Sequence, residues 1–323
     1  MRKRKSRFVQ ALVWCLIRLE LPLVLPLFYT IPLLPRKAVM GLSRFLGRAV
    51  YRAAKTERRV ALANLDLAFG DTRSAAEKQA IALASLQTFF LTLLDFAWFS
   101  RRSRERLDRW LKFDSSLDSY FTHPPVIVAT AHFGNWEVQG QGAALMGAPL
   151  LSVAAMFPSE PINRFMTRCR EQHGMTVVPR EGALKTLMRT LKKGGRVALL
   201  MDQNTRISEG GMFVRFFGTP ATMSPAASVL AIRTGAAIMP VVCRAMPDGS
   251  YLGSTPGRIE PAPGETVEQL NQKIADAFES EIRKHPDQWL WMYRRWKYVP
   301  EGDKAERYPF YAHPATKSNG EEP

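Results

Sequence analysis

The chain has 323 residues, 46% of them hydrophobic and 23% charged, which excludes a disordered or fibrous protein and suits one large domain or two small ones. Forty-five Lys and Arg against 29 Asp and Glu leave a formal net charge of +16, which favours an acidic or phosphorylated partner: nucleic acid, anionic lipid or an acidic carrier protein. Three cysteines without paired spacing argue against a disulfide framework and a cysteine-based zinc site.

The first segment of the chain is basic and then apolar. Basic residues within positions 2–7 precede an apolar stretch, 8–34, that two charges and three prolines interrupt. Its longest uninterrupted part, 21–34, is shorter than the about 20 apolar residues that a regular spanning helix needs. Basic residues on both sides favour a segment that dips into one leaflet, with both flanks on the anionic cytoplasmic face. We therefore expect a membrane anchor over residues 1–37, and a buried N-terminal helix is the alternative.

Two helices are expected after this anchor. Apolar residues recur at helical spacing over 38–70, where a Gly-Asp-Thr turn ends the first helix. Asp71 or Thr72 can cap a second helix that runs to about Trp98. Within this second helix, the segment 86–99 is apolar almost all round, so it either lies in the core or faces the membrane.

From position 124 onward, short apolar runs alternate with segments of helical periodicity. Buried strands are expected at 126–130, 150–156, 176–179, 196–201, 213–217 and 238–243. Helices are expected at 161–173, 182–193, 224–234 and 266–284. This alternation predicts an α/β fold with a mainly parallel central sheet flanked by helices. We expect that domain to span 38–312, followed by a disordered tail over 313–323.

The strand at 126–130 leads directly into the string His132-Phe-Gly-Asn-Trp-Glu137. In open α/β sheets, ligands bind outside the carboxyl ends of the strands, which is where this string begins. Positions five apart in a continuous helix diverge by about 140°. The two side chains can therefore meet only if His132 lies in the turn before a helix and Glu137 lies in its first turns. Gly134 permits such a turn, and Asn135 is a good N-cap.

Together, His132 and Glu137 would form a catalytic dyad. Glu137 would accept the proton on one imidazole nitrogen and fix the tautomer, which leaves the other nitrogen free as general base for a hydroxyl group. The activated hydroxyl would attack a thioester, and the helix N-terminus and a nearby arginine could stabilise the oxyanion. The spacing alone also fits a histidine that only makes a hydrogen bond at a helix start. The longer string Ala-His-Phe-Gly-Asn-Trp-Glu after a buried strand is far more restrictive.

Other chemical motifs are weaker than this string. Cys169 lies in a basic amphipathic stretch and could be a nucleophile, although an inert half-buried thiol is the simpler interpretation. The sequence has no His-Glu-x-x-His, Gly-x-Ser-x-Gly or Walker motif, and we expect no bound metal. A nucleic-acid-binding protein would account for the charge but not for the apolar segment or the dyad, and no recognised nucleic-acid module is present.

The string from Ala131 to Glu137 resembles the late acyltransferases of lipid A biosynthesis, within the lysophospholipid acyltransferase superfamily. The resemblance covers most of the chain, up to the aromatic and basic segment at 291–297. It implies an acyltransferase domain over 38–312, with His132 and Glu137 as the general-base dyad and Arg170 as the arginine that assists them. The residues that it implies for substrate binding are Asn135, Arg180, Asp202, Gln203, Phe217, Gly218 and Thr219.

This resemblance also implies the substrates. Acyl carrier protein would donate a fatty acyl thioester, with acyl-coenzyme A as the alternative donor, and no cofactor would be needed. The acceptor would be a hydroxyl of a lipid A precursor. A lysophospholipid, a mannosylated phosphatidylinositol or another anionic envelope glycolipid is the alternative acceptor. The expected place is the membrane surface on the cytoplasmic face of the bacterial inner membrane, and no nucleic acid is expected as a partner.

Overall fold

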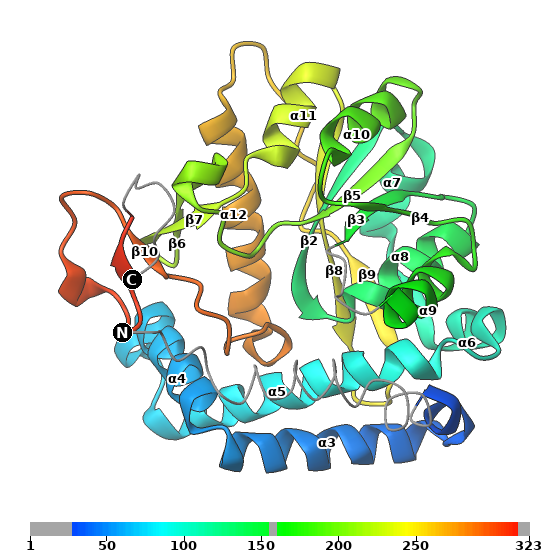
Figure 1. The fold of residues 1–323 in the computed structure, drawn as a ribbon, viewed down its shortest axis with the longest axis horizontal. Helices are drawn as coiled ribbons and strands as arrows, with labels where there is room; N and C mark the ends of the chain where they lie inside the picture. Colours follow the sequence, from blue (N-terminus) through cyan, green and yellow to red (C-terminus); the bar gives the residue numbers. More distant parts are fainter. Residues whose placement is uncertain (1–27, 155–159, 316–323) are drawn as a thin grey trace.

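A seven-stranded sheet lies at the centre of the structure, a computed structural model that describes residues 28–154 and 160–315 (Figure 1). The strand order is β1-β9-β8-β2-β5-β3-β4, and neighbouring strands are parallel except for β8 and β9. This confirms the predicted α/β fold with a mainly parallel sheet. The strands are β1 (Leu111–Phe113), β2 (Val126–Gly134), β3 (Leu151–Ala154), β4 (Thr176–Pro179), β5 (Arg196–Leu200), β8 (Ala237–Ala245) and β9 (Tyr251–Ser254).

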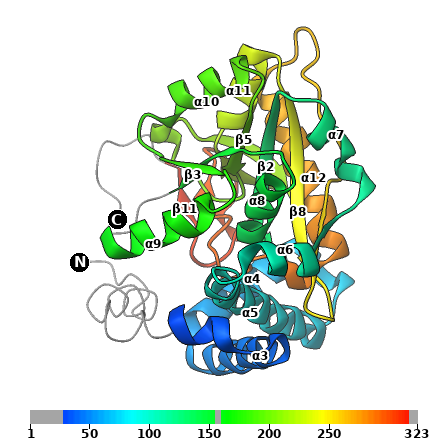
Figure 2. The ribbon, with the colours of Figure 1, turned by 90° about the vertical axis from the view of Figure 1, so that its right-hand side faces the viewer.

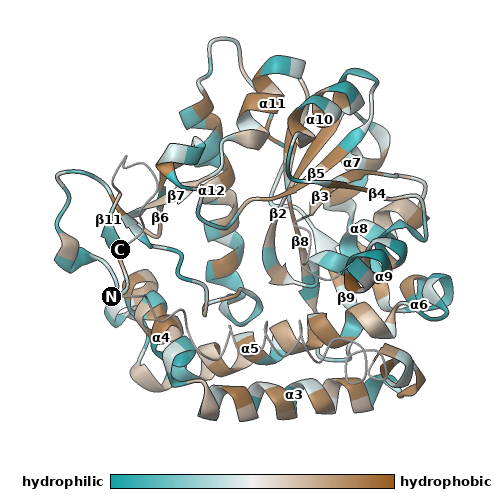
Figure 3. Ribbon diagram, viewed as in Figure 1, coloured by the Kyte–Doolittle hydropathy of each residue, from teal (hydrophilic) through white to brown (hydrophobic). Residues whose placement is uncertain are grey.

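Helices cover both faces of this sheet (Figures 1 and 2). They are α6 (Ser103–Trp110), α7 (Asp118–Thr122), α8 (Trp136–Leu145), α9 (Glu160–Glu171), α10 (Ala183–Lys192), α11 (Ala226–Thr234) and α12 (Val267–Lys284). Along β2, Val126 and Val128 pack with residues of α7 and α8, whereas Ile127 and Ala129 pack with residues of α10, α11 and α12. Burial on both faces explains why the central strands are mostly hydrophobic (Figure 3).

Three further helices form a layer that the carboxyl end of β2 points toward (Figure 1). They are α3 (Arg36–Ala53), α4 (Lys55–Phe69) and α5 (Ala75–Trp98). The single helix predicted over 38–70 is therefore wrong. The chain forms two helices there, because the backbone leaves helical geometry at the buried Ala54, where ψ is 73°.

The start of α5 differs from the predicted one, although its end at Trp98 is as predicted. Ser74, rather than Asp71 or Thr72, is the N-cap. The Ser74 side chain accepts a hydrogen bond from the backbone N–H of Glu77, whose carboxylate in turn accepts one from the backbone N–H of Ser74. This capping box satisfies two backbone donors at once, which a residue nearer the turn could not do.

Among the described residues, α5 is the helix that is long and apolar enough to cross a membrane. It has 24 residues and a most apolar window with a mean hydropathy of 1.7, and half of that window is buried inside the protein. A buried core helix passes the same test, so α5 is weak evidence for a membrane span. Residues 1–27 of the predicted anchor lie outside the described residues, so the anchor stays a prediction.

Two small sheets lie outside the central one. The strands β6 (Met212–Phe216) and β7 (Thr219–Met223) form an antiparallel hairpin, so the strand predicted at 213–217 does not belong to the central sheet. The strands β10 (Tyr298–Val299) and β11 (His313–Pro314) pair in parallel, so residues 313 and 314 of the predicted tail are ordered, and residues 316–323 lie outside the described residues. Short 3-10 helices complete the structure: η1 (Ile31–Leu33), η2 (Gly70–Thr72), η3 (Ser115–Leu117), η4 (Ile207–Glu209), η5 (Pro286–Gln288) and η6 (Ala305–Arg307).

Candidate active site

His132 lies at the carboxyl end of β2, the central strand. The strand continues through His132 to Gly134, with an irregular register between Thr130 and Gly134, so the turn predicted at His132 begins two residues later. Gly134 has a φ of +56°, and a Cβ atom there would lie 1.8 Å from the carbonyl oxygen of Cys243. Only glycine fits at this position. Its backbone then places Asn135 as the N-cap of α8, with its side-chain oxygen 3.1 Å from the backbone nitrogen of Val138.

Asp202 is the residue that holds the imidazole of His132. Its Oδ1 lies 2.8 Å from Nδ1 of His132, and its Oδ2 accepts a hydrogen bond from the backbone N–H of His132 at 3.0 Å. An ionised carboxylate only accepts hydrogen bonds, so Nδ1 carries the proton and Nε2 presents a lone pair. The two residues meet because β2 and β5 are neighbouring parallel strands whose carboxyl ends lie at one edge of the sheet.

The environment of Asp202 favours its charged form. The side chain is buried, with 4% of it exposed. Burial alone would raise the pKa of this carboxyl group, but the electrostatic interaction with His132 and the hydrogen bonds from His132 and Trp289 outweigh it. The pKa of Asp202 therefore lies below its ordinary value, and the carboxylate stays available to orient the imidazole at neutral pH.

Glu137 has a different partner from the one predicted. Its carboxylate accepts two hydrogen bonds from Arg170 on α9, at 2.9 Å from Nε and 2.7 Å from Nη2. Both side chains are largely buried, at 17% and 13% exposed. Burial would lower the pKa of Arg170, but the hydrogen bonds and charge of Glu137 raise it above the ordinary value. The expected contact of Glu137 with an imidazole nitrogen is replaced by this bidentate ion pair, since α8 turns Glu137 toward α9.

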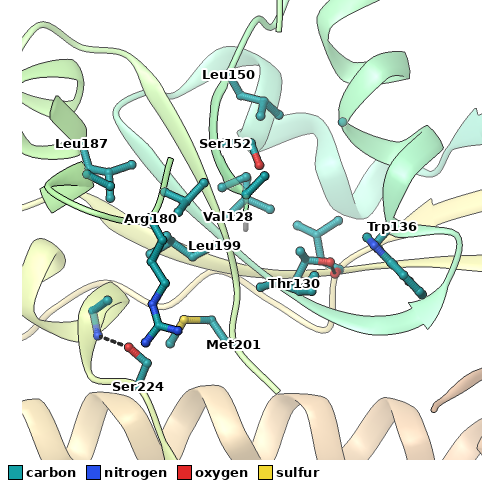
Figure 4. Close-up of a pocket in the computed structure, with 18 of the residues that line it drawn as sticks. Val128, Thr130, Trp136, Leu150, Ser152, Arg180, Leu187, Leu199, Met201 and Ser224 are labelled. Atoms are coloured by element: carbon teal, nitrogen blue, oxygen red, sulfur yellow. Dashed lines mark hydrogen bonds between the residues drawn. The ribbon is translucent and has the colours of Figure 1, made fainter. Parts of the chain in front are cut away.

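The cavity beside His132 has a volume of about 830 Å³. His132, Glu137, Arg170, Arg180 and Gln203 all line it. Most of its other lining residues are apolar, and they come from both faces of the sheet (Figure 4). On the side of α7 and α8 they include Leu117, Tyr120, Val128, Ala143 and Leu150. On the side of α10 and α11 they include Leu187, Leu199, Met201, Ala226 and Val229.

Two of the polar side chains that line this cavity are Gln203, beside the imidazole, and Arg180, which is largely exposed. The Nε2 atom of Gln203 lies 3.3 Å from Nε2 of His132. Because Nδ1 carries the proton, the amide of Gln203 donates in this contact. Arg180 has a largely exposed side chain, 3.5 Å from the carboxylate of Glu209, and Figure 4 shows it pointing into the cavity. An anionic group of a ligand that met Arg180 there would compete with the exposed carboxylate of Glu209.

The other predicted substrate-binding residues do not line the cavity, and neither does Asp202, which contacts His132 instead. Asn135 is completely buried and acts as a helix cap. Phe217 and Gly218, with φ values of +50° and +75°, form the turn of the β6–β7 hairpin, and Thr219 begins β7. Phe217 packs in an aromatic cluster with four other rings, those of Phe69, Phe216, Trp291 and Trp296. Phe217 therefore belongs to the hydrophobic core, where it packs against Trp291 and Trp296.

Cys169 is structural in this arrangement. Its thiol is buried, with 3% exposure of the residue, and it is not among the residues that line the cavity. Burial raises the pKa of Cys169 to about 12. A thiol with such a pKa stays protonated at neutral pH and is a poor nucleophile. The inert thiol, one of the two interpretations of the sequence, is therefore the one that the environment favours.

Fold and site together define a class of protein: an α/β protein in which a carboxylate-bound histidine lies at a large apolar cavity. Residues 14–298 match the family model described as bacterial lipid A biosynthesis acyltransferase. The match spans most of the chain, and the protein belongs to this family.

Individual relatives are distant. The chain is 26% identical over 280 residues to the lipid A biosynthesis palmitoleoyltransferase of Escherichia coli, which covers 84% of this chain and 89% of that protein. It is 28% identical over 200 residues to the phosphatidylinositol mannoside acyltransferase of Mycobacterium tuberculosis, which covers 61% of this chain and 62% of that protein. For the Mycolicibacterium smegmatis protein of the same name the identity is 28% over 174 residues, and the chain spans only 56% of its length.

A solved structure is also similar. The 1-acyl-sn-glycerophosphate acyltransferase of Thermotoga maritima aligns with a TM-score of 0.39 and 12% sequence identity. The alignment covers 79% of this chain and 99% of that chain.

Proposed function

We propose that this protein transfers a fatty acyl chain from a thioester donor to a hydroxyl group of a lipid, with His132 as the general base. The observation that carries this proposal is the hydrogen bond between Nδ1 of His132 and Asp202 beside a large apolar cavity. A base with a fixed tautomer and a cavity in the size range of ligand pockets are what acyl transfer to an alcohol needs. Membership of an acyltransferase family supports the same reaction.

The proposed reaction proceeds in two steps. Nε2 of His132 takes the proton of the acceptor hydroxyl while the hydroxyl oxygen attacks the carbonyl carbon of the thioester. This gives a tetrahedral oxyanion and an imidazolium. Asp202 stabilises the imidazolium through Nδ1. The intermediate then collapses, the carbon–sulfur bond breaks, and the leaving thiolate takes the proton from Nε2 as the new ester forms. Hydroxyl and thioester thus become ester and thiol, and no cofactor takes part.

Arg170 is the residue that we assign to the oxyanion. Its guanidinium lines the cavity beside His132 and is fixed by the two hydrogen bonds to Glu137. A fixed cation in a site with little water stabilises a developing negative charge strongly, because it needs no reorganisation during the reaction. Glu137 would thus serve catalysis by holding Arg170, while Asp202 holds the base.

Acyl carrier protein is the donor that we propose, with acyl-coenzyme A as the alternative. The net charge of +16 favours an acidic carrier and an anionic acceptor. The outer face of α3 carries exposed cations without any acidic residue in the helix: Lys37, Arg44, Arg48 and Arg52. Such a face, with the exposed Phe45 beside these cations, suits the cytoplasmic surface of the bacterial inner membrane.

A hydroxyl of a lipid A precursor is the acceptor that we propose. The match to the Escherichia coli palmitoleoyltransferase spans 89% of that protein, against 62% for the mycobacterial mannoside acyltransferase, which supports this choice. The test is the lipid profile of a deletion strain by mass spectrometry. We expect lipid A that lacks one acyl chain, restored by the wild-type gene. Unchanged lipid A with an altered phosphatidylinositol mannoside or lysophospholipid would move the acceptor to that lipid.

The cavity also predicts a residue that limits the donor chain. Ala143 lines the cavity on α8, about two turns beyond the site, and Ala144 beside it is equally small and buried but does not line the cavity. We expect Ala143→Leu to lower kcat/KM about tenfold for the longest donor that is accepted, with shorter donors unaffected. Ala144→Leu is the matched control, since it overpacks the same helix. Equal selectivity changes in both variants, measured with a series of acyl donors, would contradict this placement.

A further inference from the structure

A segment near the C-terminus, residues 289–295, contacts both residues of the His132–Asp202 pair. Phe133 and Trp289 form an antiparallel bridge, and the backbone N–H of Leu290 donates to the carbonyl oxygen of His132 at 3.2 Å. The indole Nε1 of Trp289 donates to Oδ2 of Asp202 at 2.8 Å. The segment therefore fixes the strand that carries the base as well as the carboxylate that orients it.

The two oxygens of Asp202 have different tasks in this arrangement. Oδ1 faces Nδ1 of His132, whereas Oδ2 receives two donors, the backbone N–H of His132 and the indole N–H of Trp289. Two donors on Oδ2 set the rotation of the carboxylate, so that Oδ1 stays directed at the imidazole. Trp289 is 1% exposed, so it cannot rotate away without disturbing the core.

The same segment holds the loop that follows Asp202. The backbone N–H of Asn204 donates to the hydroxyl of Tyr293 at 3.1 Å, and its side-chain amide donates to the carbonyl oxygen of Arg294 at 2.6 Å. Arg295 donates to the side-chain oxygen of Asn204 at 3.1 Å. Four contacts, counting that of Trp289, thus fix residues 202–204 from one side.

Arg295 also brings a positive charge close to Asp202. The residue is 1% exposed, and among the described residues no hydrogen bond joins its guanidinium to a carboxylate. Burial lowers the pKa of Arg295 to about 10, an effect that the negative charge of Asp202 opposes. The titratable groups that face Asp202 are therefore His132, Tyr293 and Arg295.

We propose that Trp289 is a positioning residue of the active site, which directs the carboxylate of Asp202 at His132 through its indole N–H. This inference rests on the proposed function, because it assigns Trp289 a part in keeping the base in its reactive tautomer. Loss of the indole N–H leaves Oδ2 with one donor, the backbone N–H of His132, so the carboxylate is held less firmly in its orientation. It also concentrates the negative charge on Asp202, which favours the imidazolium over the free base.

The chain offers a matched control for Trp289. Trp291 is equally buried, and the two indole rings are in edge contact with centroids 4.7 Å apart. Its Nε1 also donates one hydrogen bond, of 2.7 Å, but to the backbone carbonyl of Pro286. Trp289→Phe and Trp291→Phe therefore remove the same group from the same cluster, and only the first removes a contact with Asp202.

The experiment measures both variants of the full-length protein in an acyl transfer assay, together with their melting temperatures. We expect similar melting temperatures, a kcat about tenfold or more below wild type for Trp289→Phe with unchanged KM for the donor, and a kcat within about twofold of wild type for Trp291→Phe. We also expect the acid side of the kcat profile to move to higher pH in Trp289→Phe alone. Equal loss of kcat in the two variants, with unchanged profiles, would overturn the inference.

A measurement on the wild-type protein covers the case in which Trp289→Phe does not fold. The indole N–H resonance of Trp289 should titrate over the same pH range in which activity falls on the acid side, while that of Trp291 stays constant. A Trp289 resonance that does not titrate would overturn the inference. Failure of the proposed function is distinguishable, because the wild-type protein itself would then show no acyl transfer.

Discussion

Replacing His132 by Ala is expected to lower kcat for acyl transfer by about 10²–10⁴-fold, the usual value of a general base. Asp202→Asn should cause a loss of similar size, because an amide that donates to Nδ1 would select the wrong imidazole tautomer. Neither change should alter KM for the donor much, since most of the residues that line the cavity are apolar side chains that both variants keep. The measurement is steady-state transfer by purified protein with an acyl thioester and a lipid acceptor.

The structure also predicts how these two residues combine. Because Asp202 acts through the imidazole, the double variant should be no slower than His132→Ala alone. Protonation of Asp202 should not limit the activity of wild type near neutral pH, because its pKa lies below its ordinary value. Full activity of Asp202→Asn would show that the hydrogen bond to Nδ1 has no role in the reaction.

Removing Arg170 is expected to lower kcat by about 10²–10³-fold, the size of the effect of one oxyanion donor. Glu137→Gln should also reduce kcat, because the neutral amide no longer fixes the guanidinium with two charged hydrogen bonds. The pair should show strong coupling: Arg170→Ala together with Glu137→Gln should be no worse than Arg170→Ala alone. The measurement is a double-mutant cycle on kcat.

This cycle separates two roles of Glu137. If Glu137 acts on the imidazole, as the sequence spacing predicts, its loss should be coupled to His132 and independent of Arg170. If it acts through Arg170, as the geometry supports, the coupling should be with Arg170. Additive effects of Glu137→Gln and Arg170→Ala would contradict the second role. Arg180→Ala is a suitable control, because this largely exposed arginine lines the same cavity without contacting Glu137 in the structure.

The layer architecture could be predicted from sequence because its signal is local. The central strands β2 and β8 are apolar runs buried on both faces, and helices such as α10 and α12 bury one apolar face. The boundaries of β4 at 176–179 are as predicted, and those of β5 differ by one residue. The sequence does not predict the cap of α5, because several polar residues precede that helix and only the side-chain geometry of Ser74 selects one of them.

The partner of His132 could not be predicted from spacing because it depends on strand order. Asp202 follows β5, about 70 positions after His132, and the two meet only because β5 pairs with β2. The sequence placed Asp202 at a strand end, which was the useful signal, but it did not show which strands are neighbours. The contact between Trp289 and Asp202 could not be predicted either, because the two residues are 87 positions apart and meet only in the folded chain.

The central claim is that an acyl group passes from a thioester to a lipid hydroxyl with His132 as base. The most direct measurement uses purified protein, a radiolabelled acyl carrier protein thioester and a lipid A precursor, with the labelled lipid product analysed by mass spectrometry. The account predicts one labelled acyl chain in ester linkage on the precursor, formed by wild type and lost in His132→Ala. Transfer by His132→Ala at the wild-type rate, or no labelled ester on any of the lipid hydroxyls offered, would contradict it.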